Sequence, residues 1–219
     1  MNKDMKGMWK DTLILFAITL IAGLILGGVY QVTKAPIAAQ KEKVKQEACR
    51  EVFSDAASFK DVAFHMGEEE FRTPRDTAWV ENGFDGVDIG EVMQAVDADG
   101  SSLGYIITVT AHEGYSGDIQ FMMGVRENGI LNGISLLSIS ETAGLGMRAE
   151  EVLKPQFVDR KEGDFVYVKG GAGTGLAGST GQIDVITGAT VTTSAILDGV
   201  NAGLYYFRTV LMEGGNSNG

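Results

Sequence analysis

The hydrophobic pattern separates an apolar segment near the N-terminus from a long region in which apolar and polar positions alternate. Thr12–Tyr30 (TLILFAITLIAGLILGGVY) is a run of 19 residues without a charge. At about 1.5 Å per residue, a helix of this length nearly crosses a hydrocarbon core of about 30 Å. The segment therefore predicts a transmembrane helix. The alternative is a cleaved signal peptide, but signal cores are shorter, at about 7–15 apolar residues, and no clear cleavage site follows Tyr30.

A charged region follows the apolar segment. Pro36 suits the first turn of a helix, and the sequence predicts a second helix from Ile37 to about Ala57. Its many charged residues mark a solvated stalk that leads away from the membrane. Residues 67–90 are acidic and irregular, and we predict a loop there.

Alternation with period two begins at Glu91 and predicts an antiparallel sheet. Asp99-Gly100 and Asn128-Gly129 separate the alternating runs, and such dipeptides are strong signals of tight hairpins. Met122 and Met123 are expected to pack within this sheet. The predicted meander has four strands, at about 91–97, 103–112, 119–126 and 130–140.

The C-terminal part predicts two helices. A short one is expected near Arg148–Leu153, ended by Pro155. An amphipathic one is expected from about Thr190 to Leu211, and it would pack on the sheet through Ile196, Val200, Leu204 and Phe207. The glycine-rich stretch 169–182 lacks the GxxxxGK[ST] pattern of phosphate-binding loops, so it is interpreted as a surface loop. Strands flanked by helices give an α+β domain, in which residues 213–219 form a disordered tail.

Charge and cysteine content exclude several classes of function. Residues 51–219 hold 10 Lys and Arg against 25 Asp and Glu, which excludes nucleic-acid binding because that requires a basic surface. The single cysteine, Cys49, excludes an internal disulfide and a cysteine-ligated metal cluster. We interpret it as an ordinary helix residue, with a bridge to a partner as the alternative. His65 and His112 are too few for a histidine-rich metal centre. Both flanks of the apolar segment are basic, so charge alone gives no orientation.

The segment Asp184–Ser194 (DVITGATVTTS) joins a Thr/Gly/Ala turn to the start of a helix. Unpaired backbone N–H groups and the positive end of the helix dipole stabilise a phosphate at such a position. Hydroxyl groups in the segment add donors or an attachment point: Thr187, Thr190, Thr192, Thr193 and Ser194. The alternative, which these residues favour when taken alone, is an ordinary helix capped by Thr187 or Thr190.

The same segment resembles the flavinylation motif of the FMN-binding domain family, Asp-x-x-Ser/Thr-Gly-Ala-Thr/Ser. In that family the last hydroxyl residue carries FMN as a phosphoester, which a dedicated flavin transferase transfers from FAD. The resemblance implies that Thr190 is the attachment residue of a covalent FMN. It also implies that Asp184, Thr187, Gly188 and Ala189 complete the recognised pattern.

Two other segments resemble the same family. Residues 141–146 (ETAGLG) are similar to its Glu-Thr-Pro-Gly-Leu-Gly loop, with Ala143 in place of proline. That loop lies against the isoalloxazine ring in the family, so the resemblance implies ring contacts by Glu141, Thr142, Leu145 and Gly146. Residues 114–117 (GYSG) are similar to a Gly-aromatic-Gly-Gly segment, which implies that Tyr115 lines the flavin.

The resemblance covers about residues 91–210, and the N-terminal helix and stalk fit it as well. Two kinds of subunit share this layout: the G subunit of the Rnf complex (RnfG) and the C subunit of the sodium-pumping NADH:quinone reductase (NqrC). The sequence is closer to the G subunits. It implies a cytoplasmic N-terminus (1–11), a transmembrane helix (12–30), a helical stalk (31–60), an FMN-binding domain outside the cytoplasmic membrane (61–212) and the tail (213–219).

The function implied by this resemblance is electron relay rather than catalysis by the chain alone. The covalent FMN would pass electrons within a complex that oxidises ferredoxin, reduces NAD⁺ and moves Na⁺ or H⁺. Expected partners are the other Rnf subunits, the membrane and the flavin transferase. The alternatives are the quinone-reductase subunit, an anchored assembly module without redox function, and a free-standing flavin reductase.

Overall fold

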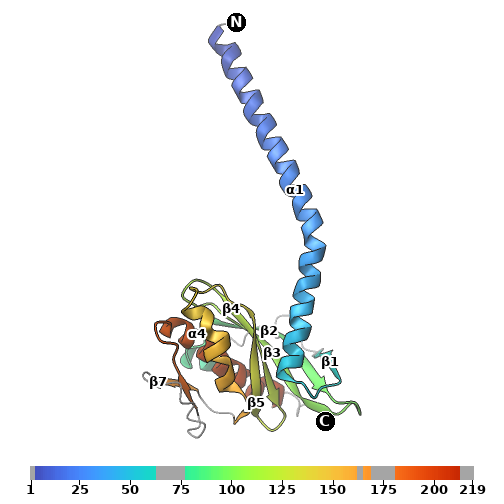
Figure 1. Ribbon diagram of the computed structural model, residues 1–219, viewed down its shortest axis with the longest axis vertical. Helices are drawn as coiled ribbons and strands as arrows, with labels where there is room; N and C mark the ends of the chain where they lie inside the picture. Colours follow the sequence, from blue (N-terminus) through green and yellow to red (C-terminus); the bar gives the residue numbers. More distant parts are fainter. Residues whose placement is uncertain (1–2, 63–76, 162–164, 169–180, 213–219) are drawn as a thin grey trace. The chain divides into compact units, whose positions relative to one another are not determined.

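One long helix, α1 (Lys3–Val52), precedes all of the strands (Figure 1). The computed structural model describes residues 3–62, 77–161, 165–168 and 181–212. Contacts divide the chain into two units, Met1–Lys45 and Gln46–Gly219, so the last turns of α1 belong to the second unit.

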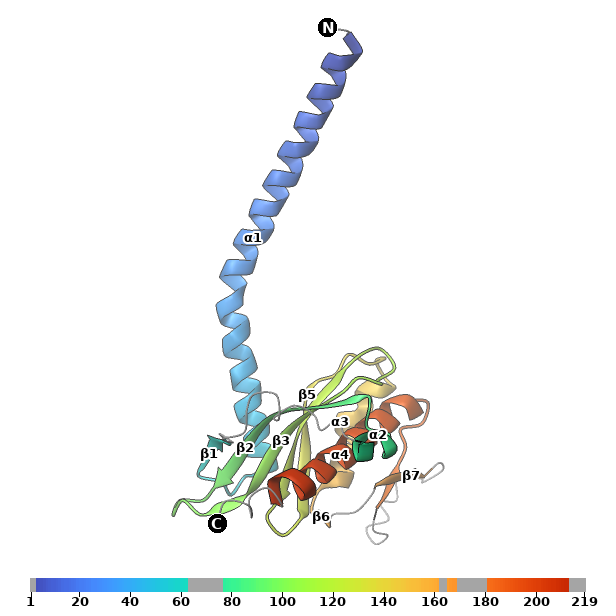
Figure 2. The same cartoon turned by 180° about the vertical axis from the view of Figure 1, so that it is seen from behind.

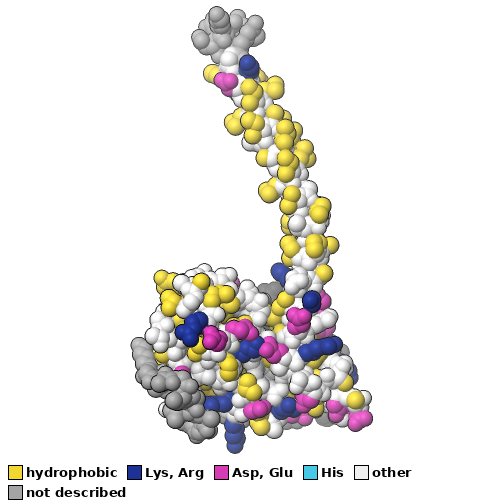
Figure 3. All heavy atoms as spheres, in the orientation of Figure 1, with side chains coloured by type: hydrophobic (Ala, Val, Ile, Leu, Met, Phe, Trp, Pro, Cys, Tyr) yellow, Lys and Arg dark blue, Asp and Glu magenta, His cyan; other side chains and the backbone are white. Residues whose placement is uncertain are grey.

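The first unit contains the apolar part of α1. This helix is long and apolar enough to cross a membrane: its most apolar 18-residue stretch has a mean hydropathy of 2.5, and none of that stretch is buried inside the protein. Figure 3 shows hydrophobic side chains along this part of the helix. Transfer of each large apolar side chain out of water is favourable by about 1.5–3 kcal/mol. A lipid bilayer provides an apolar environment for the whole segment.

The prediction that Pro36 begins a second helix is wrong. The helix α1 runs through Pro36 without a break and ends at Val52, before the predicted end near Ala57. A proline inside a helix removes one backbone hydrogen bond, but the flanking turns contain strong helix formers such as alanine, glutamine and lysine, which continue the helix. The first and second predicted helices are therefore one element.

A six-stranded antiparallel sheet forms the centre of the second unit, with its strands in chain order across the sheet. The predicted four-stranded meander is confirmed as β2 to β5. The edge strands β1 and β6 were not predicted, because runs this short carry no clear alternation. The strands are β1 (Ser58–Asp61), β2 (Val87–Val96), β3 (Ser102–Ala111), β4 (Ile119–Arg126), β5 (Ile130–Ser138) and β6 (Arg160–Lys161).

The region predicted as a loop before residue 91 contains regular structure. A short helix, α2 (Thr77–Glu81), lies within it, and β2 begins at Val87. The register of β2 against β3 shifts between Ile89 and Val92, which marks a β-bulge. The bulge interrupts the period of two, so the alternation is visible only after it. Residues 67–76 of the predicted loop lie outside the described part of the chain.

The helix α4 (Thr190–Tyr206) packs across one face of the sheet (Figure 2). The side chains of Ile196, Val200 and Leu204 are fully buried, and Phe207, in the following π-helix η3 (Phe207–Met212), is buried as well. The predicted amphipathic helix and its core positions are therefore confirmed. These residues join inward-facing side chains of β3 and β4 in the larger hydrophobic core.

The opposite face of the sheet is covered by the C-terminal end of α1. Ala48, Cys49 and Val52 pack with Ile106 and Met122 in a second, smaller core. The thiol of Cys49 lies 3.9 Å from the sulfur of Met122 and is buried. Burial disfavours a disulfide from Cys49 to a partner and supports its interpretation as an ordinary helix residue. The sheet is thus the middle of three layers.

Short elements connect the sheet to α4. They are the 3₁₀-helix η1 (Gly146–Arg148), α3 (Ala149–Val152), the 3₁₀-helix η2 (Lys154–Phe157) and two short parallel strands, β7 (Val166–Val168) and β8 (Gln182–Asp184). The helix predicted near 148–153 is present, but Pro155 lies inside η2 instead of ending helical structure, because proline suits the first turn of a helix. Of the glycine-rich stretch, residues 169–180 lie outside the described part, and Gln182 is in a strand.

Replacing Gly104 with alanine should destabilise the sheet strongly. Gly104 has φ +152°, and a Cβ there would lie 2.2 Å from the backbone oxygen of Val125. Backbone strain and overpacking each cost about 1–3 kcal/mol, so we expect a lower free energy of unfolding and a lower midpoint in thermal unfolding of the full chain in detergent. Gly100→Ala is the matched control, because Gly100 has φ +84° but open space around it. Equal losses for both variants would contradict the clash.

Candidate functional site

Three segments far apart in the sequence surround one cavity of about 440 Å³ in the second unit. The β3–β4 loop contributes one residue, the segment from the end of β5 to the first residue of η1 contributes four, and the turn before α4 together with the first turn of α4 contributes five. The volume lies within the range of small-molecule sites, about 300–1,000 Å³. The lining residues are Tyr115, Glu141, Thr142, Leu145, Gly146, Gly188, Ala189, Thr190, Val191 and Thr192.

The first turn of α4 forms one wall of the cavity. The cap is Ala189, with φ −134° and no side-chain hydrogen bond, so the alternative of an ordinary helix capped by Thr187 or Thr190 is wrong. Thr193 closes the turn from inside, because its hydroxyl donates to the oxygen of Ala189 (2.9 Å) and accepts the N–H of Ile186 (3.2 Å). The first-turn N–H groups are thus left without a side-chain cap at the helix end that attracts anions.

Thr190 is the first residue of α4 and lines this cavity. Its side chain is half-buried, and with the described parts of the chain its hydroxyl makes no hydrogen bond. A threonine hydroxyl without a structural partner, at the mouth of a cavity and beside helical N–H groups, can form an ester with a phosphate.

Asp184 and Thr187 are not among the residues that line the cavity. Asp184 ends β8, where its backbone is held from both sides by the side chain of Gln156: its N–H donates to Oε1 (2.8 Å) and its oxygen accepts from Nε2 (3.2 Å). Thr187 is exposed in the turn before Gly188. The two residues therefore belong to the turn that precedes Thr190. Their side chains do not join the other predicted site residues in the cavity.

Gly188 shapes the turn between β8 and α4. It has φ +82°, a conformation that glycine adopts at low cost. A Cβ at this position would lie 3.1 Å from the Cδ2 of Leu145, so the turn passes close to the loop of residues 141–146. The two predicted motifs, far apart in sequence, meet at this point.

The loop of residues 141–146 forms the second wall. Glu141 is 8% exposed although it carries a carboxylate. Gly146 lies so close to its neighbours that a Cβ would be 2.6 Å from the Cβ of Glu141 and 2.7 Å from the hydroxyl oxygen of Thr192. Gly146 therefore fixes the distance between this loop and the first turn of α4. Leu145, 41% exposed, presents an apolar surface to the cavity.

The β3–β4 loop brings Tyr115 to the mouth of the cavity. Tyr115 is 72% exposed, and the N–H of the following residue, Ser116, donates to Glu141 Oε1 over 3.4 Å. Gly114 makes the tight turn possible, because a Cβ there would lie 2.2 Å from the oxygen of Gly117. The buried carboxylate of Glu141 thus joins two walls of the cavity.

Sequence reasoning missed two lining residues, Val191 and Thr192. They follow Thr190 in the first turn of α4, so helical geometry carries both toward the cavity. The sequence indicates Thr192 only as one of several hydroxyls in the segment, and its close approach to Gly146 has no sequence signal. The exposure of Val191, 48%, is the one feature that a helical projection could have indicated.

Comparisons with known proteins agree with the motifs that meet at this cavity. Residues 114–205 match the FMN-binding domain family, and residues 1–52 match the RnfG N-terminal region. The crystal structure of Shewanella oneidensis NqrC has 18% sequence identity and a TM-score of 0.49, over 57% of this chain and 60% of that chain.

Two relatives extend the match to nearly the whole chain. The G subunit of the Na(+)-translocating ferredoxin:NAD(+) oxidoreductase complex of Acetobacterium woodii is 30% identical over 213 residues, 94% of this chain and 95% of that protein. The G subunit of the ion-translocating oxidoreductase complex of Methanosarcina acetivorans is 28% identical over 204 residues, 93% of this chain and 96% of that protein. Identity at this level over nearly the full length of both proteins assigns the chain to the family of G subunits of ion-translocating oxidoreductase complexes, RnfG.

Proposed function

We propose that this chain carries FMN as a phosphoester on Thr190 and relays electrons as the membrane-anchored G subunit of an Rnf-type ferredoxin:NAD⁺ oxidoreductase. One observation carries the proposal: eight of the ten residues that the sequence motifs single out line a single cavity, and Thr190 lies within it at the first turn of α4. The motifs at residues 114–117, 141–146 and 184–190 are separated by 23 and 37 residues, so their meeting is not a consequence of sequence proximity.

The residues of the cavity suit the two ends of an FMN. The uncapped first turn of α4 suits a phosphate, because its N–H groups and dipole stabilise negative charge. The apolar side chains of Leu145 and Val191 and the ring of Tyr115 suit a planar aromatic ring. Gly146 and Gly188 keep the walls close, since a Cβ at either position would meet a neighbouring side chain. The site therefore fits this cofactor class.

Attachment to Thr190 is a group transfer from FAD. In the proposed reaction the Thr190 hydroxyl loses its proton and its Oγ1 forms a bond to the FMN phosphorus, while the pyrophosphate bond of FAD breaks and AMP leaves. A flavin transferase is the partner that we propose for this step. The structural contribution of the chain is to present Thr190 at a half-buried position at the start of α4, directly after a turn in which Thr187 and Gly188 are exposed.

Bound FMN would supply reversible one- and two-electron redox chemistry. The chain would hold it between α4 and the loop of residues 141–146, with the buried carboxylate of Glu141 on the same cavity wall. A covalent bond to Thr190 would prevent dissociation when the redox state changes, and so permits an open site. We propose that the electron-transfer partners of the chain are other Rnf subunits. We also propose that the N-terminus lies in the cytoplasm and that the FMN domain lies outside the cytoplasmic membrane.

The test is in-gel fluorescence of the denatured full chain after co-expression with a flavin transferase, followed by peptide mass mapping. We expect a fluorescent band, and FMN mapped to the peptide that contains Thr190. The same chain expressed without the transferase should give a dark band. A dark band with an active transferase, checked on a known substrate of that enzyme, would contradict the proposal and favour an anchored module without redox function.

A further inference from the structure

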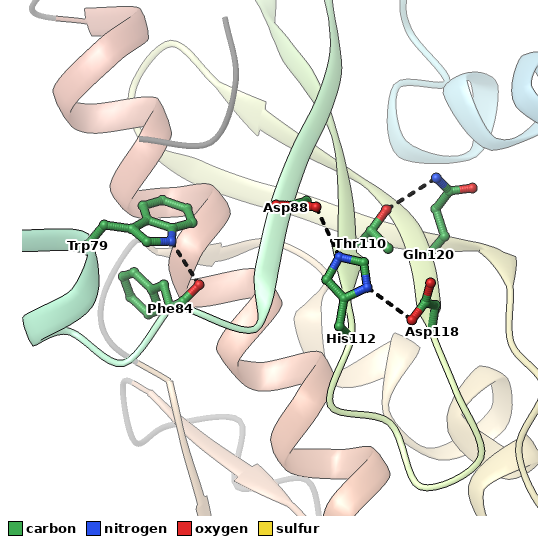
Figure 4. A network of polar contacts seen from close by, with 7 residues as sticks. All are labelled: Trp79, Phe84, Asp88, Thr110, His112, Asp118 and Gln120. Atoms are coloured by element: carbon green, nitrogen blue, oxygen red, sulfur yellow. Dashed lines mark hydrogen bonds and ion pairs between the residues drawn. The ribbon is translucent and has the colours of Figure 1, made fainter. Parts of the chain in front are cut away.

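A histidine and two aspartates join three parts of the sheet next to the cavity loop. His112 Nδ1 lies 3.0 Å from Asp118 Oδ1, and His112 Nε2 lies 3.0 Å from Asp88 Oδ2. Figure 4 shows the imidazole ring between the two carboxylates, with Asp88 on β2 and Asp118 at the end of the β3–β4 loop. The neighbouring Thr110–Gln120 hydrogen bond links β3 and β4 on the same face.

Both contacts of His112 can be hydrogen bonds only when the ring is protonated. A neutral imidazole carries one N–H, so one of its nitrogens would present a lone pair to a carboxylate oxygen. An imidazolium donates from both nitrogens. The hydrogen bond to Asp118, followed by that to Asp88, raises the pKa of His112 above its ordinary value. The arrangement of two acceptors around one ring therefore selects the charged form.

Two of these three residues, His112 and Asp118, are the first and last residues of the loop that contains Tyr115. His112 begins the loop directly after β3, and Asp118 ends it directly before β4. Between them, Gly114 and Gly117 form the tight turn, and Ser116 donates to Glu141. The loop is thus held to the sheet at its base by His112 and to the cavity wall at its tip by Glu141.

The other acidic side chains near the loop, Glu113 and Asp198, make different contacts. The side chain of Glu113 lies over Gly86, where an added Cβ would be 2.7 Å from its Cγ. Glu113 also raises the pKa of Asp198 on α4, behind the larger effect of burial. Among the described residues, Asp118 and Asp88 are the charged groups that act on His112, whereas the negative charge of Glu113 acts on Asp198.

We propose that His112 is a positioning residue of the cavity: by bridging Asp88 and Asp118 in its protonated form, it closes the base of the β3–β4 loop and holds Tyr115 at the cavity mouth. The consequence for bound FMN rests on the proposed function, whereas the clamp itself is a property of the chain. Raising the pH through the pKa of the bridged His112 removes one of the two donors and loosens the loop.

The sign of the pH dependence follows from the raised pKa. The stabilisation of the closed loop is fully present below the ordinary pKa of histidine, about 6.5, and is lost as the pH rises through the higher pKa of the bridged ring. The closing equilibrium weakens by up to about tenfold for each unit that separates the two pKa values. Because the ring is partly exposed, salt should reduce this effect.

The clamp is tested by hydrogen exchange of the full chain in detergent between about pH 5.5 and 9. We expect exchange of the peptide spanning residues 112–118, relative to the same peptide in His112→Gln, to be slow at low pH and to approach the variant at high pH. Asp118→Asn should move this transition to lower pH, and Gln120→Ala should leave it unchanged. His65→Gln removes the only other histidine as a source of the transition. If the ratio of exchange between the wild type and His112→Gln does not change with pH, the clamp is overturned. This ratio requires only the wild type and His112→Gln.

The effect on the cofactor is tested on the flavinylated chain through the fluorescence of FMN, which a tyrosine ring in contact quenches. We expect fluorescence to rise over the pH range in which the loop loosens, and no such step in Tyr115→Leu or His112→Gln. A step that persists in Tyr115→Leu would overturn the positioning of Tyr115 at the cofactor. If no flavin attaches to the chain, the proposed function fails, and hydrogen exchange still decides the clamp.

Discussion

Replacing Thr190 with valine should abolish covalent flavin and leave the fold intact. Valine has the shape of threonine but no hydroxyl, so the Oγ–P bond cannot form. The loss of stability should be about 1 kcal/mol or less, because Thr190 is half-buried, does not cap α4 and makes no side-chain hydrogen bond with the described parts of the chain. In-gel fluorescence of the denatured protein should fall to background, while the thermal midpoint of the full chain should change little.

Conservative variants decide whether the attachment is specific to this hydroxyl. Thr190→Ser keeps a hydroxyl and should still carry flavin. Thr187→Val removes an exposed hydroxyl of the recognised pattern, outside the cavity lining, and leaves the Thr190 hydroxyl in place, so the flavin that this variant carries should still map to Thr190. Flavin that persists in Thr190→Val and disappears in Thr187→Val would show that Thr190 is not the attachment residue.

Much of the fold could be predicted because long, regular elements carry a clear period. The strands β3 and β4 alternate over their whole length, and α4 repeats its buried residues at helical spacing. Prediction failed where a local feature breaks the period or where an element is short. The bulge near Gly90 hid the start of β2, and Pro36 suggested a boundary that the strong helix formers around it override.

The site was predictable in its motifs and not in its contacts. The turn at Gly188 and the loop at Leu145 were each identified by their own residues, but their close approach, which leaves little room for a Cβ at Gly188, depends on how α4 packs on the sheet. The same holds for His112. A lone histidine gives no signal of its partners when one of them, Asp88, lies on another strand and is 24 residues away.

The contact between these motifs makes Gly146 the most sensitive position of the cavity apart from Thr190. A Cβ at residue 146 would collide with Glu141 Cβ at 2.6 Å and with Thr192 Oγ1 at 2.7 Å. Relief requires the loop of residues 141–146 to move away from α4, at a cost of about 1–3 kcal/mol. If this free energy destabilises the arrangement in which the loop lies against α4, Gly146→Ala should slow flavin attachment by about 5–150-fold. The rate is measured as the gain of fluorescence with FAD and flavin transferase.

Two further variants separate this collision from a general disturbance of the loop. Gly144→Ala strains the same loop, because Gly144 has φ +76°, but it adds no contact, since nothing lies within 4 Å of the new Cβ. It should slow attachment less than Gly146→Ala. Adding Thr192→Ala to Gly146→Ala removes one of the colliding atoms and should restore part of the rate, a coupling that distant, independent sites do not show. Strict additivity of the Gly146 and Thr192 effects would mean that the loop and the first turn of α4 do not act as one wall of the cavity.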